Sequence, residues 1–384
     1  MKVPFNRPHL TGEELDCLAL ALERRVLSGN GPFGRACQTW LEERFGCAKA
    51  LLTHSATGAL EMAALLADVG PGDEVVMPSY TFVSTANAFA LRGAVPVFVD
   101  VREDTLNIDE TLIEAAITER TKAIVVVHYA GVPCEMGPIS TIAERHGLML
   151  IEDAAQAFLS TYLGRSLGTI GHLGVFSFHE TKNVVSGEGG ALLVNDERFS
   201  DRAEVLWEKG TDRSKYFRGQ VDKYTWVDLG SSYLPSELVA AFLYPQLRRS
   251  EEITARRRLV WDLYHEAFAG LEREGRVRRP IVADGCDFNA HLYYLILEDE
   301  KDRADLIQAL GAQGISSVFH YVPLHSSPAG RRYGRASGEL PITDRVSERL
   351  LRLPMFVGAD DEAVDVVVRE VLAFHRRRSR RHVA

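Results

Sequence analysis

Residues 176–195 read FSFHETKNVVSGEGGALLVN, and they place one lysine, Lys182, between two apolar runs. The runs at 174–178 and 191–194 are short and apolar, which is typical of buried strands. A glycine-rich turn at 186–190 separates Lys182 from the second run. On this segment alone an ordinary solvated loop lysine is the simpler interpretation, so the role of Lys182 depends on the rest of the chain.

Short strands alternate with helical segments from about residue 50 to residue 195. Continuous apolar runs of this kind are typical of strands that are buried on both faces; they occur at 49–52, 74–77, 95–99, 123–127 and 148–151. Strands that alternate with helices predict an α/β fold with a mainly parallel sheet flanked by helices. Ligands bind such sheets at the carboxyl ends of the strands.

The sequence pattern changes after about residue 235. Residues 234–271 predict a long amphipathic helix that is interrupted near Pro245, and shorter strand and helix patterns follow. We therefore expect a large α/β domain at 1–240, and a connecting helix with a smaller α+β domain at 241–384.

Composition excludes several classes of protein. The net charge of −9 argues against a nucleic-acid-binding surface, and no apolar run is long enough to span a membrane. The five cysteines form no C-x-x-C pair, so neither a zinc site nor a disulfide framework is predicted. The N-terminus has no signal-peptide pattern, and we expect a cytoplasmic protein. His320 and His325 do not have the spacing of metal ligands on a helix, so we expect no metal.

The segment GNGPFG at 29–34 matches the G-x-G-x-x-G pattern of dinucleotide sites. That pattern requires a preceding strand, whereas a helical pattern precedes this one. We interpret it as a glycine-rich active-site loop.

The motif THSATG at 53–58 lies between a predicted strand and a predicted helix. Free N–H groups and the positive end of the dipole at a helix start attract anions, so Ala56 and Thr57 are candidates for binding a phosphate. Simple capping of the helix by Ser55 or Thr57 is the alternative.

Two further strand ends carry unusual side chains. Glu152 and Asp153 end an apolar strand, where a carboxylate needs a cation or hydrogen bonds unless it lies just clear of the core. Phe82, in PSYTFV at 78–83, either stacks on a ligand ring or fills the core.

Together these sites outline a flat, phosphorylated, cationic ring that is bound covalently by an amine, which describes pyridoxal 5'-phosphate (PLP). Lys182 would bond to the cofactor's aldehyde carbon, and Asp153 would keep the ring nitrogen protonated so that the ring withdraws electrons. The other cofactor contacts would come from the strand ends: phosphate contacts from Ala56, Thr57 and Ser177, stacking by Phe82 and a hydrogen bond from Gln156.

These residues stand in motifs that resemble the DegT/DnrJ/EryC1/StrS nucleotide-sugar aminotransferases, over residues 3 to 370. The motifs are SATGAL at 55–60, PSYTF at 78–82, EDAAQ at 152–156 and SFHETKN at 177–183. The resemblance implies a fold-type I PLP enzyme with a mainly parallel seven-stranded central sheet. Longer strings resemble the branch that makes dTDP-4-amino-4,6-dideoxygalactose; they lie at 78–89, 107–118, 168–172 and 217–226.

The resemblance also implies substrates and an assembly. L-glutamate would be the amino donor, and dTDP-4-keto-6-deoxyglucose the acceptor, aminated at C4. The enzyme would be a homodimer with shared active sites, in which Ser232 replaces the asparagine that many relatives direct at the neighbour's cofactor phosphate. Lys182 stands where dehydratases of the family have histidine, which favours transamination.

Three residues are candidates for substrate binding: Arg213 for the diphosphate, and Tyr321 and His325 near the sugar. Two alternatives remain open at this point. One is a ligand-binding regulator without catalysis, and the other is a PLP enzyme of another reaction type, such as a lyase.

Overall fold

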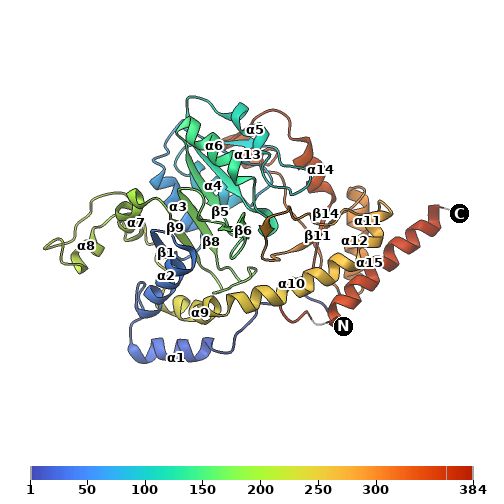
Figure 1. Ribbon diagram of the computed structural model, residues 1–384, viewed down its shortest axis with the longest axis horizontal. Helices are drawn as coiled ribbons and strands as arrows, with labels where there is room; N and C mark the ends of the chain where they lie inside the picture. The colour runs from blue at the N-terminus through green and yellow to red at the C-terminus, as the bar shows by residue number, and fades with distance from the viewer. Residues whose placement is uncertain (1, 360, 383–384) are drawn as a thin grey trace.

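An eight-stranded sheet forms the centre of the computed structural model, which describes residues 2–359 and 361–382 (Figure 1). In spatial order its strands are β1 (Lys49–Thr53), β9 (Gly190–Val194), β8 (Leu173–Ser177), β5 (Met149–Asp153), β4 (Thr121–Val127), β2 (Glu74–Pro78), β3 (Val95–Val99) and β13 (Arg335–Ala336). Strand β9 is antiparallel to both of its neighbours, and the other pairs are parallel. The predicted mainly parallel sheet is confirmed, with one strand more than the seven expected because β13 pairs with β3.

Helices cover both faces of this sheet, which explains why the middle of each long strand is apolar. Successive residues of β2 show the alternation, because Val75 and Met77 pack in one core cluster and Val76 packs in another. The first face is covered by α3 (Ala56–Leu66), α4 (Val83–Ala90) and α7 (Ser200–Trp207). The other is covered by α2 (Pro32–Phe45), α5 (Glu110–Ala116), α6 (Met136–His146) and α9 (Glu237–Arg248).

A second, three-stranded antiparallel sheet has its own hydrophobic core. Its order is β11 (Tyr293–Ile296), β14 (Leu350–Leu353), β12 (Val318–Phe319). The helices α10 (Ser250–Ala267), α12 (Glu300–Ala312) and α15 (Asp361–His382) pack around this sheet (Figure 1). The other α-helices are α1 (Glu14–Arg24), α8 (Arg213–Phe217), α11 (Ala269–Arg273), α13 (Pro328–Tyr333) and α14 (Pro341–Arg349). A small sheet contains β10 (Cys286–Asp287), β6 (Thr161–Tyr162) and β7 (Arg165–Ser166).

The predicted long helix at 234–271 is three helices, α9, α10 and α11. The break after α9 falls at Arg249 and not at Pro245, which lies inside α9. The predicted domain boundary at residue 240 falls within α9 as well, and the division into two domains stays a prediction. In the part of the chain described, no helix is both long and apolar enough to cross a membrane.

The sheet direction decides where the functional groups gather. Because β1, β2, β4, β5 and β8 run parallel within one sheet, their carboxyl ends share an edge. The four motifs found in the sequence all follow these strands, so the fold brings them to one place.

Candidate active site

A cavity of about 550 Å³ lies at this edge of the sheet. Its lining includes every predicted cofactor residue except Ser232: Ala56, Thr57, Phe82, Asp153, Gln156, Ser177 and Lys182. The predicted substrate residue Tyr321 also lines it. The structure therefore brings the strand-end residues together around one space.

Lys182 follows β8 in a tight turn, in which its N–H donates to the His179 carbonyl at 2.9 Å. Burial removes water from the ammonium group and is the main cause that lowers the pKa of Lys182 to about 8. The Asp153 charge opposes this shift, and the Arg352 charge adds to it. An amine with that pKa is partly neutral near physiological pH and can act as a nucleophile or a base.

Asp153 is the last residue of β5, and its side chain is 6% exposed. Thr85 Oγ1 donates to Oδ2 at 2.7 Å, and the Ala155 N–H donates to Oδ1 at 3.2 Å. Burial raises the pKa of Asp153 in spite of these bonds. In the described chain no lysine or arginine nitrogen lies within 4.0 Å of this carboxylate, so a protonated ring nitrogen would supply the cation that it lacks.

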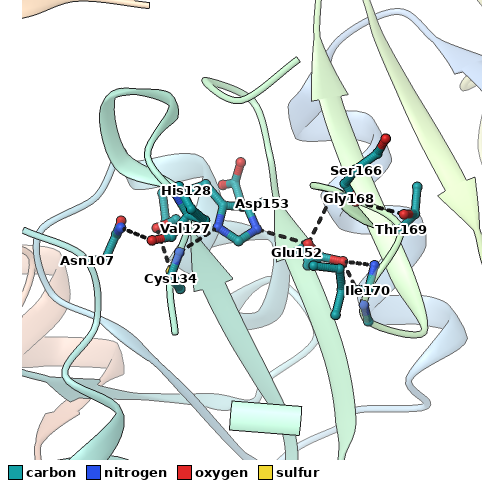
Figure 2. A network of polar contacts seen from close by, with 12 residues as sticks. Asn107, Val127, His128, Cys134, Glu152, Asp153, Ser166, Gly168, Thr169 and Ile170 are labelled. Carbon is teal, nitrogen blue, oxygen red and sulfur yellow. Dashed lines mark hydrogen bonds and ion pairs between the residues drawn. The ribbon is translucent and has the colours of Figure 1, made fainter. Parts of the chain in front are cut away.

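Glu152 points away from the cavity, and the hydrogen bonds of its carboxylate fix the end of β5 (Figure 2). It is fully buried and accepts hydrogen bonds from His128 Nε2 at 2.9 Å and from the N–H groups of Gly168, Ile170 and Gly171 at 2.6 to 2.8 Å. Because the Cys134 N–H donates to His128 Nδ1 at 3.2 Å, the ring proton resides on Nε2. This network ties β4 and β5 together just below Asp153, which keeps the Asp153 backbone in place.

The start of α3 also lines the cavity. Ser55 Oγ caps the helix by accepting from the Gly58 N–H at 3.1 Å, as the capping alternative predicted. The Ala56 and Thr57 N–H groups precede the first intrahelical bond, from Ala59 N–H to the Ser55 carbonyl, so they remain suited to bind an anion. A Cβ on Gly190 would lie 2.4 Å from the Ala56 nitrogen, so any residue other than glycine at position 190 would displace the start of α3.

The sides of the cavity are aromatic and amide groups. Phe82 is 57% exposed, and its ring centroid lies 6.3 Å from that of Tyr321. Gln156 Oε1 accepts from the Ala130 N–H at 2.8 Å, and Nε2 donates to the Tyr321 hydroxyl at 2.9 Å. These bonds fix the orientation of the Gln156 amide and leave it a second N–H to donate.

Three predicted residues do not line this cavity. Ser232 and Arg213 line a different cavity of about 890 Å³, together with residues 29–32 of the glycine-rich segment. His325 lies behind Ser79, with Nδ1 2.8 Å from Ser79 Oγ. Of the two histidines in FHYVPLH, it is His320 that lines the cavity containing Lys182.

The cavity residues that sequence reasoning missed include Thr85, His291, His320 and Arg352. Thr85 has no sequence signal, because only the packing of α4 turns it toward Asp153. Arg352 had a signal that could have found it, since it is a charged residue inside the apolar run LLRLPMF.

Residues 8–372 match the DegT/DnrJ/EryC1/StrS aminotransferase family. The chain belongs to this family. It is 34% identical over 377 residues to spore coat polysaccharide biosynthesis protein SpsC of Bacillus subtilis (strain 168), covering 96% of each chain.

Two solved structures illustrate the similarity of this aminotransferase to its relatives. The aminotransferase TlmJ from Streptoalloteichus hindustanus is 32% identical, with a TM-score of 0.89 over 98% of this chain and 99% of that one. The PLP-form of Spr1654 from Streptococcus pneumoniae is 27% identical, with a TM-score of 0.90 over 98% and 99% of the two chains.

The family resemblance, the fold-type I architecture and the cofactor predicted from the sequence are thereby confirmed. The protein is a PLP-dependent sugar aminotransferase, which transfers an amino group to the keto group of a nucleotide sugar. When bound, PLP withdraws electrons from the carbon that carries the amino group, which makes the proton on that carbon removable.

Proposed function

We propose that this aminotransferase moves the amino group of L-glutamate to C4 of a dTDP-4-keto-6-deoxyhexose, giving a dTDP-4-amino-4,6-dideoxy sugar and 2-oxoglutarate. The observation that carries the proposal is the placement of the Lys182 amine and the Asp153 carboxylate on one cavity. The strings at 78–89, 107–118, 168–172 and 217–226 support this acceptor, because they resemble the branch that makes dTDP-4-amino-4,6-dideoxygalactose.

Each residue has a defined task in this proposal. Lys182 would hold the cofactor covalently, and its amine would take the proton from the donor's α-carbon. Asp153 pairs with the ring nitrogen, and Gln156 donates to the ring's oxygen. Ala56, Thr57 and Ser177 would hold the phosphate at the helix start, and Phe82 would cover the ring. In the second half of the cycle Lys182 returns protons so that the amino group stays on C4 of the sugar.

Product analysis tests the reaction directly. Incubation of the holoenzyme with L-glutamate and dTDP-4-keto-6-deoxyglucose should give a 4-amino sugar nucleotide, identified by mass spectrometry and NMR, and an equal amount of 2-oxoglutarate. A parallel incubation with a 3-keto sugar nucleotide is the matched control. Amination of the 3-keto sugar alone would refute the proposed position, and product without 2-oxoglutarate would refute the proposed donor.

We also propose a homodimer in which each subunit completes its neighbour's site. The segment around α8 projects from the rest of the molecule (Figure 1) and exposes large apolar side chains: Tyr216, Phe217, Tyr224, Trp226, Val227 and Leu229. Exposed apolar side chains that gather in this way are typical of an interface. Arg213 is the first residue of α8, and both Arg213 and Ser232 line a cavity other than that of Lys182, which supports the idea that they serve the partner's cavity.

Mixed dimers distinguish a shared site from a self-contained one. Lys182→Ala removes the proposed covalent anchor, and Ser232→Asp places a negative charge against the proposed phosphate of the neighbour. Each homodimer should be inactive or nearly so. Dissociation and reassembly of a one-to-one mixture should restore about one quarter of wild-type activity, because half of the dimers then hold one intact site of two.

No gain of activity on mixing would show that Ser232 serves its own chain. Ser232 is exposed in the isolated chain, so its replacement should leave the fold intact, which a thermal melt of the Ser232→Asp protein checks. Light scattering of the wild-type protein measures the dimer independently.

A further inference from the structure

His291 presents a ring nitrogen without a partner to the cavity that contains Lys182. It lies just before β11, its side chain lines this cavity, and it is only 5% exposed. Within residues 2–359 and 361–382, Nδ1 of its ring has a hydrogen-bond partner, whereas Nε2 has none and is open to the cavity. A polar atom in a buried side chain is costly to leave unpaired, so Nε2 marks a place where a ligand binds.

The hydrogen bonds of Asn183 decide which ring nitrogen of His291 carries the proton. Asn183 Nδ2 donates to the Asn289 carbonyl at 2.7 Å, so the Asn183 oxygen is the atom that meets His291 Nδ1, at 3.0 Å. Because an amide oxygen only accepts, Nδ1 donates and Nε2 keeps its lone pair. Arg257 fixes the backbone here by donating to the carbonyls of Ala290 and His291. Nε2 is therefore a hydrogen-bond acceptor in a fixed position.

The surrounding charges exclude a cationic ligand at this acceptor. Burial is the main cause that lowers the pKa of His291 well below its usual value, so the ring is neutral. Three nearby cations add to the shift: Lys182, Arg257 and Arg352. The two arginines stay charged at working pH, and they would repel an ammonium group placed against Nε2. The ligand group that fits is therefore a neutral O–H or N–H.

The proposed substrates offer one such donor next to the reacting carbon. L-glutamate has two carboxylates, which only accept hydrogen bonds, and an amine that the reaction consumes. In the nucleotide sugar the diphosphate also only accepts, and the base lies beyond it. The sugar hydroxyls remain. In a 4-keto-6-deoxyhexose the C3 hydroxyl is the one beside the C4 ketone, because C5 carries no hydroxyl.

We propose that His291 Nε2 accepts a hydrogen bond from the C3 hydroxyl of the acceptor sugar and thereby selects 4-keto sugars that carry this hydroxyl. The inference rests on the proposed function and deepens it, because it assigns a contact to the sugar ring itself. Lys182 acts at C4, and His291 holds the neighbouring carbon in position. His291 is thus a specificity-determining residue outside the motifs that indicated the cofactor.

Paired substrates test this contact in the acceptor half-reaction of the holoenzyme. dTDP-4-keto-6-deoxyglucose is compared with its 3-deoxy analogue, which lacks only the C3 hydroxyl. In His291→Asn the amide can still donate to Asn183 in place of Nδ1, whereas the acceptor at Nε2 is removed. For the hydroxylated sugar, kcat/KM should fall about 5- to 50-fold, the range for a hydrogen bond whose partner is left unpaired. For the 3-deoxy analogue, kcat/KM should stay at the wild-type value.

The preference between the two sugars is measured within each protein, so a smaller folded fraction of a variant does not change it. Wild type should prefer the hydroxylated sugar by about the factor that His291→Asn loses. His291→Gln brings an amide oxygen near the place of Nε2 and should recover part of this preference.

Binding of an unreactive ligand separates the contact from catalysis. dTDP-6-deoxyglucose has the C3 hydroxyl but no ketone, so it binds without being aminated. Its Kd, measured by calorimetry, should rise in His291→Asn by about the same factor as kcat/KM falls. The 3-deoxy form of this ligand should bind wild type and His291→Asn equally.

The matched control is His146→Asn, because His146 is exposed on α6 and pairs with Glu114, and it should leave the preference unchanged. An equal fall of kcat/KM for both sugars would assign His291 to the chemistry at Lys182 and overturn the proposal. A larger KM for L-glutamate alone would assign it to the donor, with the same consequence. If wild type aminates no 4-keto sugar nucleotide, the proposed function itself fails; if it does and His291→Asn keeps the wild-type preference, only this inference fails.

Discussion

Replacement of Lys182 by alanine should lower kcat by about 10⁴-fold or more, because one side chain provides both the covalent anchor and the proton transfers. No other lysine among the described residues lines the cavity, so nothing on the chain can replace it. Lys182→Arg should be equally inactive, since a guanidinium keeps the charge but is not deprotonated at working pH. Steady-state kinetics with both variants separate the need for a nucleophile from the need for a positive charge.

Lys182→Ala should also change the stability of the cofactor-free protein in a pH-dependent way. The folded-state pKa of Lys182, about 8, lies below the ordinary lysine value of 10.5, so holding the ammonium in the cavity destabilises the cofactor-free protein. Lys182→Ala should therefore raise the melting temperature below pH 8. The gain should shrink as the pH rises from 8 toward 10.5, where the unfolded chain also loses its proton. Calorimetric melts of the cofactor-free wild type and Lys182→Ala across this pH range measure the difference in melting temperature.

Lys301→Ala is the matched control, because Lys301 is exposed on α12 and pairs with Asp305. Lys301→Ala should leave unchanged both kcat and the pH dependence of the melting temperature. Wild-type turnover in Lys182→Ala would remove the residue from the proposed mechanism.

The central part of the site could be predicted from the sequence because of the way a parallel sheet is built. Each short motif directly follows its own strand, so its position depends on local sequence only, and the sheet brings the strand ends together. Asp153 and Lys182 are 29 positions apart in the chain. Their strands, β5 and β8, are nevertheless neighbours in the sheet.

The parts that were not predicted depend on tertiary packing. Arg352 reaches the cavity from β14 of another sheet, and its orientation depends on the register with Tyr294 and Val318. His325 was favoured over His320 because the sequence gives no way to tell which of two nearby loop histidines faces a cavity. Ser232 was assigned through the resemblance, and its place in a different cavity leaves its role a proposal.

Replacement of Asp153 by asparagine should lower kcat by about 10²-fold or more, because a neutral amide cannot keep the ring nitrogen protonated. The change is nearly isosteric. Asparagine can still accept from Thr85 Oγ1, and this bond holds the side chain in the native structure at 2.7 Å. Loss of activity can therefore be assigned to the charge, and Thr85→Val, which removes only that bond, should have a smaller effect. Steady-state kinetics of Asp153→Asn and Thr85→Val show which substitution lowers kcat more.

Stability provides an independent measurement of the same charge. Burial raises the pKa of Asp153 in the folded protein above the ordinary value of 3.8, so at neutral pH the ionised carboxylate destabilises the cofactor-free protein. Asp153→Asn should melt at a higher temperature than wild type at pH 7, and the difference should disappear below pH 3.8, where the wild-type group is protonated in both states. Added PLP should stabilise wild type more than the variant, because only the carboxylate pairs with the ring's cation. Equal stabilisation together with near-normal turnover would place the ring nitrogen somewhere other than beside Asp153.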